Sequence, residues 1–111
     1  MLPSSQRLAT KQLEEVLGKG KVVHTPFFWL RFISSKDNTR VSVITPQKTI
    51  KSAVMRNLLR RKVYSVIRPF INEVKQHFHI ILCVKEPMIK AETLQIKEKT
   101  KEIFVVAGLL K

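Results

Sequence analysis

The densest group of residues able to do chemistry lies within residues 48–68, where Lys and Arg recur among apolar residues. Arg56 and Arg60 are four residues apart, so their side chains would be neighbours on a helix. Asn57 and Arg61 have the same spacing. Planar guanidinium groups bind phosphate well, and an Asn amide can contact a phosphate or a base edge. The pattern therefore predicts binding to a polyanion, with an ordinary solvated cationic helix face as the alternative.

The same segment has the features of a helix that packs on a core. Ser52 is a candidate N-cap, and Pro69 ends the helix after Arg68. At about 100° per residue, apolar side chains gather on one face of this helix. They are Met55, Leu59, Val63, Val66, Ile67 and Phe70. The opposite side, which we call the basic face, consists of Arg56, Asn57, Arg60, Arg61 and Arg68 and is expected to point outward.

The whole chain is strongly basic, with 21 Lys and Arg against 8 acidic residues and a net charge of +13. Such an excess indicates a polyanionic partner, with nucleic acid first and an anionic membrane surface second. Because 44% of the residues are hydrophobic, the 111 residues can form one packed domain spanning residues 1–111. No apolar run approaches the ~18 residues of a membrane-spanning helix, and no secretory signal is present. We therefore expect a cytoplasmic protein.

The other elements alternate in type along the chain. A short helix is expected from Thr10, with Leu13, Val16 and Leu17 forming an apolar stripe before Gly18 and Gly20. Such a stripe ordinarily packs in the core. Residues 22–33 form one or two strands, and a strand at 40–45 is expected to pair with them as a hairpin. Residues 78–85 are apolar throughout, which is typical of a strand covered on both faces. The order of elements predicts an α+β or α/β sandwich with a small sheet, and we favour the α+β class.

Two segments carry more detailed expectations. Period-two alternation in residues 22–33 puts Phe27, Trp29 and Arg31 on one face, a possible platform for stacking bases. Core packing is the alternative for Phe27 and Trp29. Residues 89–107 follow a helical pattern that Gly108 ends. Its expected buried side consists of Leu94, Ile103, Phe104, Val106, Ala107 and Leu110.

No catalytic residue is predicted within this chain. None of the carboxylates lies beside a His at the spacing of a known motif, and there is no glycine-rich phosphate loop. His77 and His79 have no third ligand near them, so a metal site is not expected. Cys83, the single cysteine, lies in an apolar run and is expected to be a buried, inert thiol.

Residues 48–61, KTIKSAVMRNLLRR, resemble the KK-x-x-x-KAV-x-RNR-x-KR signature of the bacterial ribonuclease P protein subunit. The resemblance extends over nearly the whole chain, including the GKGK turn at residues 18–21 and the strand-like segments 27–32 and 78–85. Leu58 stands where the family usually has the second Arg of RNR. The resemblance implies a two-layer α-β sandwich, ribosomal protein S5 domain 2-like, with a mainly four-stranded sheet and the basic helix in a βαβ crossover.

The resemblance also implies a function, the removal of the 5′ leader from precursor tRNA. In this family the RNA subunit carries the hydrolysis with Mg²⁺, and the protein assists by binding RNA. The catalytic RNA would contact Lys48, Lys51, Arg56, Asn57, Arg60, Arg61 and Arg68. The precursor tRNA leader would contact Leu13, Val16, Phe27, Trp29 and Arg31. The alternatives are a structural RNA-binding module such as a ribosomal protein and, less favoured, a duplex DNA binder; neither a membrane nor DNA is the expected partner.

Overall fold

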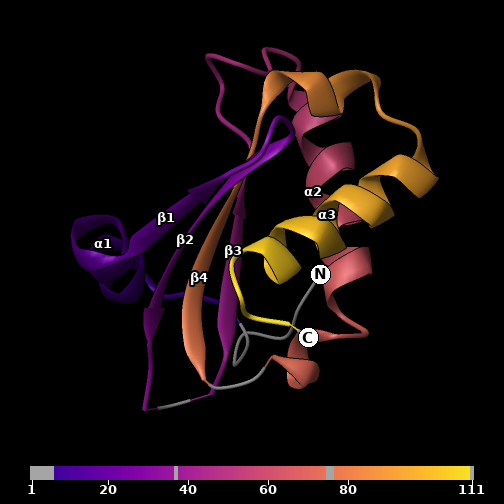
Figure 1. The fold of residues 1–111 in the computed structure, drawn as a ribbon. Helices are drawn as coiled ribbons and strands as arrows, with labels where there is room; N and C mark the ends of the chain where they lie inside the picture. The colour runs from indigo at the N-terminus through magenta and orange to yellow at the C-terminus, as the bar shows by residue number, and fades with distance from the viewer. Residues whose placement is uncertain (1–6, 37, 75–76, 111) are drawn as a thin grey trace.

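The computed structural model describes residues 7–36, 38–74 and 77–110 (Figure 1). The first part of the predicted N-terminal lead, residues 1–6, lies outside these ranges. The described elements are α1 (Thr10–Lys19), β1 (Lys21–His24), β2 (Phe28–Ser34), β3 (Arg40–Ile44), α2 (Ala53–Ile67), β4 (Phe78–Val84) and α3 (Thr93–Val106). Two 3₁₀ helices, η2 (Ile71–Glu73) and η3 (Glu86–Lys90), connect the later elements. No helix in the described ranges is long and apolar enough to span a membrane.

The four strands form one sheet in the order β1-β2-β4-β3. Strand β2 pairs antiparallel with β1 and with β4, whereas β3 pairs parallel with β4. Helix α2 connects these parallel strands, so the predicted α+β class and the βαβ crossover of the basic helix are confirmed. Helices α2 and α3 cover one face of the sheet, and α1 lies against the other face (Figure 1).

The predicted hairpin between residues 22–33 and the strand at 40–45 is wrong. Phe28 of β2 lies opposite Val84 of β4, and Arg40 of β3 lies opposite His79 of β4. Strand β4 therefore separates β2 from β3. The physical reason is that β4 is the most apolar strand, and the centre of the sheet is where both of its faces can be buried.

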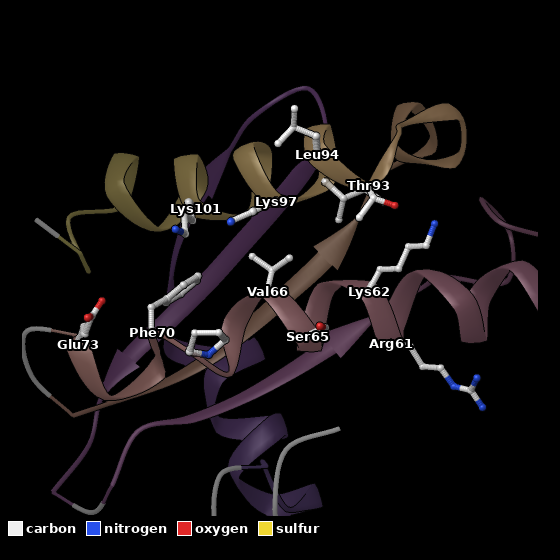
Figure 2. Close-up of a pocket in the computed structure, with 12 residues that line it drawn as sticks. Arg61, Lys62, Ser65, Val66, Phe70, Glu73, Thr93, Leu94, Lys97 and Lys101 are labelled. Atoms are coloured by element: carbon white, nitrogen blue, oxygen red, sulfur yellow. The ribbon is translucent and has the colours of Figure 1, made fainter.

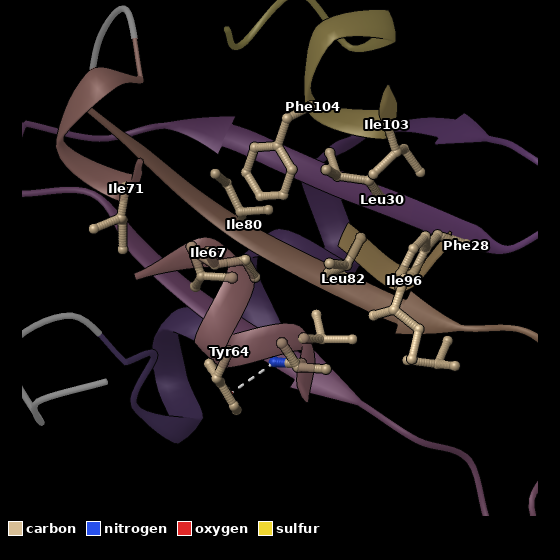
Figure 3. Packing of buried hydrophobic residues seen from close by; sticks show 14 of the residues in the cluster. Phe28, Leu30, Tyr64, Ile67, Ile71, Ile80, Leu82, Ile96, Ile103 and Phe104 are labelled. Atoms are coloured by element: carbon tan, nitrogen blue, oxygen red, sulfur yellow. Dashed lines mark hydrogen bonds between the residues drawn. The ribbon is translucent and has the colours of Figure 1, made fainter. Parts of the chain in front are cut away.

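Helices α2 and α3 pack side by side over the sheet and leave a groove between their outward sides (Figure 2). Beneath them lies the main core, to which every strand contributes apolar side chains (Figure 3). Leu59, Val63 and Ile67 of α2 are buried there, as the helical wheel predicted. Met55 and Val66 are partly buried against the same cluster.

The predicted buried side of the last helix is only partly correct. Ile103 and Phe104 are fully buried, but Leu94 is 66% exposed and Val106 is 58% exposed. Ile96 turns inward instead. The reason is helical spacing within α3: Leu94 lies nine residues before Ile103 and Val106 two residues after Phe104, so at about 100° per residue each points roughly opposite to the buried side chain.

The Tyr64 hydroxyl accepts a hydrogen bond from a buried backbone N–H of the edge strand β3. The backbone N–H of Val43 in edge strand β3 donates to the Tyr64 hydroxyl at 3.0 Å, and Tyr64 is buried (Figure 3). A Tyr64→Phe variant should therefore lose about 1 kcal/mol of unfolding free energy, because a buried donor loses its partner. Urea denaturation measures this loss. Unchanged stability with an unchanged m-value would contradict the role assigned to the hydroxyl.

Candidate nucleic-acid interface

The basic face lies on helix α2. An N-cap fixes where this helix begins, and the core fixes which side of it faces inward. The Ser52 hydroxyl accepts the Met55 backbone N–H at 3.2 Å, which confirms Ser52 as the N-cap of α2. The inner side is fixed by the core under α2. Asn57, Arg61 and Arg68 are exposed on the outer side of the helix. One helix thus holds a buried apolar side and a cationic side in a fixed relation.

Arg56 and Arg60 lie at the flank of α2 and bind the segment that precedes the helix. The Arg56 guanidinium donates to the carbonyl oxygens of Ile50 at 2.9 Å and Lys51 at 3.0 Å. Both arginines are half-buried, so the expectation that they point fully outward is corrected. The wheel missed this because these carbonyls belong to the irregular segment before the helix.

The Arg60 guanidinium donates to the Thr45 hydroxyl at 2.9 Å and also to the Asn57 side-chain oxygen. Because a guanidinium carries five N–H donors, each flank arginine keeps donors for a ligand. These bonds hold the forks in place before any ligand arrives. Arg61 differs, because no hydrogen bond or ion pair joins it to another described residue.

The approach to α2 adds two more cations. Lys48 and Lys51 are exposed, and both lie immediately before the helix N-terminus. The partial positive charge of a helix N-terminus also favours anions there. Leu58, which stands at the motif position usually held by Arg, is 41% exposed and offers no donor. Six of the seven residues predicted to contact the catalytic RNA therefore lie on α2 or on the segment leading into it, and the seventh, Arg68, is the C-cap of α2.

A second surface lies beside α1 on the opposite side of the sheet. Trp29 and Arg31 share this sheet face, because they lie opposite Cys83 and Ile81 of β4, which are buried outside the main core. The Arg31 guanidinium donates to the carbonyl oxygen of Leu17 near the end of α1, and it lies 5.9 Å from the centre of the Trp29 ring. Arg31 therefore ties α1 to the sheet.

The close approach of α1 to β2 depends on Gly20. A Cβ atom at this position would lie 2.5 Å from the Val16 carbonyl oxygen and 2.7 Å from Cγ of Arg31. Only glycine fits there without a shift of the backbone. The spacing between α1 and the sheet face that carries Trp29 is therefore set by this contact.

Two of the predicted leader-contact residues are placed differently from expectation. Val16 is 0% exposed, so its side chain supports α1 and is not accessible to a ligand. Phe27 does not share the face of Trp29, since it packs against the main core with Lys99 of α3 at 5.5 Å from its ring centre. The cause is that β2 begins only at Phe28, so strand alternation does not extend back to residue 27. Leu13 is half-buried and stays on the α1 side.

Two further side chains with reactive groups, Cys83 and His79, lie on strand β4. Burial raises the pKa of the Cys83 thiol to about 11, with Lys85 opposing the shift, so the thiol stays protonated at neutral pH. His79 Nε2 lies 3.0 Å from the Ser35 hydroxyl. Within the described ranges, no group of three or more His, Cys, Asp or Glu side chains is placed to hold a metal ion.

Comparison with known proteins identifies the family. The family model described as Ribonuclease P matches residues 2–108. The ribonuclease P protein component of Pseudanabaena sp. is 26% identical, over 99% of this chain and 97% of its own length. That of Syntrophomonas wolfei is 28% identical, over 98% and 92%.

A solved structure has the same fold. The RNase P protein of Staphylococcus aureus superimposes with a TM-score of 0.86, covering 96% of this chain and 98% of that one at 20% sequence identity. This chain belongs to the ribonuclease P protein family.

Proposed function

We propose that this chain binds the catalytic RNA of ribonuclease P through the basic face of α2. The observation that carries the proposal is the one-sided construction of α2: its apolar side lies in the core, Arg61 is exposed, and Arg56 and Arg60 are held at the flank. Neutralising RNA phosphates releases counterions, which favours association at moderate salt. Lys48 and Lys51 extend the same surface in front of the helix.

We propose a separate role for the surface beside α1, where the single-stranded 5′ leader of precursor tRNA would bind. The half-buried Trp29 ring would stack a base, an interaction of about 1–3 kcal/mol per base. Exposed apolar surface at Leu17 and Val22 lies near it. Arg31 serves this surface mainly by holding α1, because its guanidinium contacts the Leu17 carbonyl.

The hydrolytic chemistry is assigned to the RNA subunit. Mg²⁺ bound mainly by that RNA would activate the attacking water and stabilise the leaving oxygen. The protein residues bind and orient: α2 fixes the catalytic RNA, and the α1 side fixes the leader. Cations at both surfaces reduce repulsion between two polyanions. We also propose a cytoplasmic location, together with the RNA partners.

A cleavage assay at low Mg²⁺ tests this function. Precursor tRNA is incubated with the protein alone, with the cognate ribonuclease P RNA alone, and with both. The proposal expects no cleavage by the protein alone and much faster leader removal by the complex than by the RNA alone. Equal rates with and without protein across salt and Mg²⁺ concentrations would contradict it.

A further inference from the structure

The groove between α2 and α3 has the size and lining of a ligand site. Its volume is about 760 Å³, within the range of roughly 300–1,000 Å³ typical of small-molecule sites. Its apolar lining includes Val66 and Leu94 (Figure 2), together with Pro69 and the largely buried Phe70 and Ile96. Neither the basic face nor the surface beside α1 accounts for this groove. It is a third feature of the molecule.

Lysines surround this apolar lining. Lys62 comes from α2, and Lys97 and Lys101 come from α3, where their ammonium groups point toward the groove (Figure 2). No hydrogen bond or ion pair joins any of the three to another described residue. Lys99 of the same helix does pair, with Glu102 at 3.2 Å. The positive charges of these three lysines are therefore not paired with another described side chain.

The charge is nearly all of one sign. Among the described residues that line the groove, Glu73 is the only carboxylate, and it lies at one end of the groove beyond Phe70 (Figure 2). An apolar lining with cations beside it suits a ligand that has an apolar ring face and a phosphate. A nucleotide has both parts, since every base offers an apolar face for stacking or packing.

The groove is continuous with the basic face. Arg61 belongs to the basic face and also lines the groove, with its guanidinium directed away from it (Figure 2). RNA bound along α2 would therefore pass the opening of the groove. Helix α1 lies on the opposite face of the sheet from α2 and α3 (Figure 1), and Trp29 lies on the α1 side. The leader proposed for that side is therefore not the RNA that reaches the groove.

We propose that the α2–α3 groove is a second RNA subsite, which takes one unpaired nucleotide of the RNA bound on the basic face. The base packs against Val66 and Pro69, and the phosphates contact Lys62, Lys97 and Lys101. This inference rests on the proposed function, because it requires RNA on α2. The groove then adds a contact to an unpaired base, which the backbone of an RNA duplex alone cannot make.

The direct test is a titration of the isotope-labelled full chain with AMP, followed by NMR. Saturable amide shifts are expected at Val66, Leu94 and Lys97 and not at Trp29. They should disappear in a Lys97→Ala/Lys101→Ala variant and persist in a Lys90→Ala/Lys99→Ala control, which removes equal charge outside the groove lining. Equal shifts with ribose 5-phosphate, or stronger ones with an acidic peptide or phosphatidylglycerol vesicles, would overturn the assignment to a nucleotide.

The second test measures binding of ribonuclease P RNA to the same two variants. The groove variant should bind roughly tenfold more weakly than the control, with a salt dependence shallower by about 0.7 for each lost contact to single-stranded phosphate. Equal affinity and salt dependence of the two variants would overturn the subsite. Variants of the basic face would still lose affinity in that case, so failure of the groove is distinguishable from failure of the proposed function.

Discussion

An Arg60→Ala/Arg61→Ala variant is expected to bind ribonuclease P RNA more weakly by roughly 1–3 kcal/mol for each guanidinium removed. The reason is that both side chains belong to the basic face, and one of them is already oriented by Thr45 and Asn57. The slope of log K against log salt should become shallower by about 0.9 for each lost contact to duplex phosphate. Filter binding over a series of salt concentrations measures both quantities.

Folding should be affected much less than binding. Arg61 is exposed and contacts no other described residue through a hydrogen bond or ion pair, so its loss should leave stability unchanged. Loss of the bond from Arg60 to Thr45 should cost about 1 kcal/mol of unfolding free energy. The Lys90→Ala/Lys99→Ala variant, with equal charge removed, should keep most of its affinity. Equal losses in both variants would mean that only net charge matters and would contradict a localised interface.

A Phe104→Ala variant is expected to lose roughly 3–5 kcal/mol of unfolding free energy. Phe104 is fully buried, and its ring centre lies 5.1 Å from that of Phe70 in an edge-to-face arrangement. Truncation would leave a cavity where α3 meets the end of α2. Since small domains have only about 5–15 kcal/mol of total stability, the variant should be marginally stable.

Urea denaturation of this variant is best compared with Leu94→Ala. Leu94 lies on the same helix but is 66% exposed, so its truncation should change stability by less than about 0.5 kcal/mol. Added ribonuclease P RNA should raise the midpoint of Phe104→Ala, because a ligand that binds only the folded state stabilises it. A small loss for Phe104→Ala would contradict the assignment of this ring to the core.

The basic helix could be predicted from the sequence because its signals are local. Ser52, Pro69 and the 3.6-residue period of Leu59, Val63 and Ile67 all lie within or beside the element. The uses of Arg56 and Arg60 could not be predicted, because their carbonyl and hydroxyl partners lie in the segment before the helix. The sequence motif and the helical wheel therefore identify which residues form the basic face. Only the three-dimensional structure shows which atoms hold the Arg56 and Arg60 side chains in place.

Strand order was beyond the sequence for a different physical reason. Alternation in residues 40–44 is the same whether the strand forms a hairpin or lies parallel to a distant partner. Pairing with β4 brings Arg40 opposite His79, a contact between distant segments that no local pattern encodes. The prediction for Phe27 was wrong for a similar reason. Strand β2 begins only at Phe28, so residue 27 does not follow the alternation of that strand, and its side chain packs on the other side of the sheet.

The grouping of Lys62, Lys97 and Lys101 around one groove could not be predicted from the sequence, for a third reason. Lys97 and Lys101 occur in a helix rich in Glu, and the sequence suggests that they form surface ion pairs. Their approach to Lys62 depends on how α2 and α3 pack together. A cavity between two helices distant in sequence has no sequence signature.

The most direct test of the central claim, that the outer side of α2 faces the catalytic RNA, is cleavage of that RNA by a tethered iron–EDTA probe. The probe is attached to a Val54→Cys variant, since Val54 is 80% exposed on α2, and to a Val22→Cys control on β1, where Val22 is 43% exposed. Native Cys83 should not be labelled, because it is buried and its thiol has a raised pKa of about 11. With ribonuclease P RNA alone, the account predicts localised strand cleavage from position 54 and little from position 22. Cleavage from position 22 alone, or equally diffuse cleavage from both positions, would contradict it.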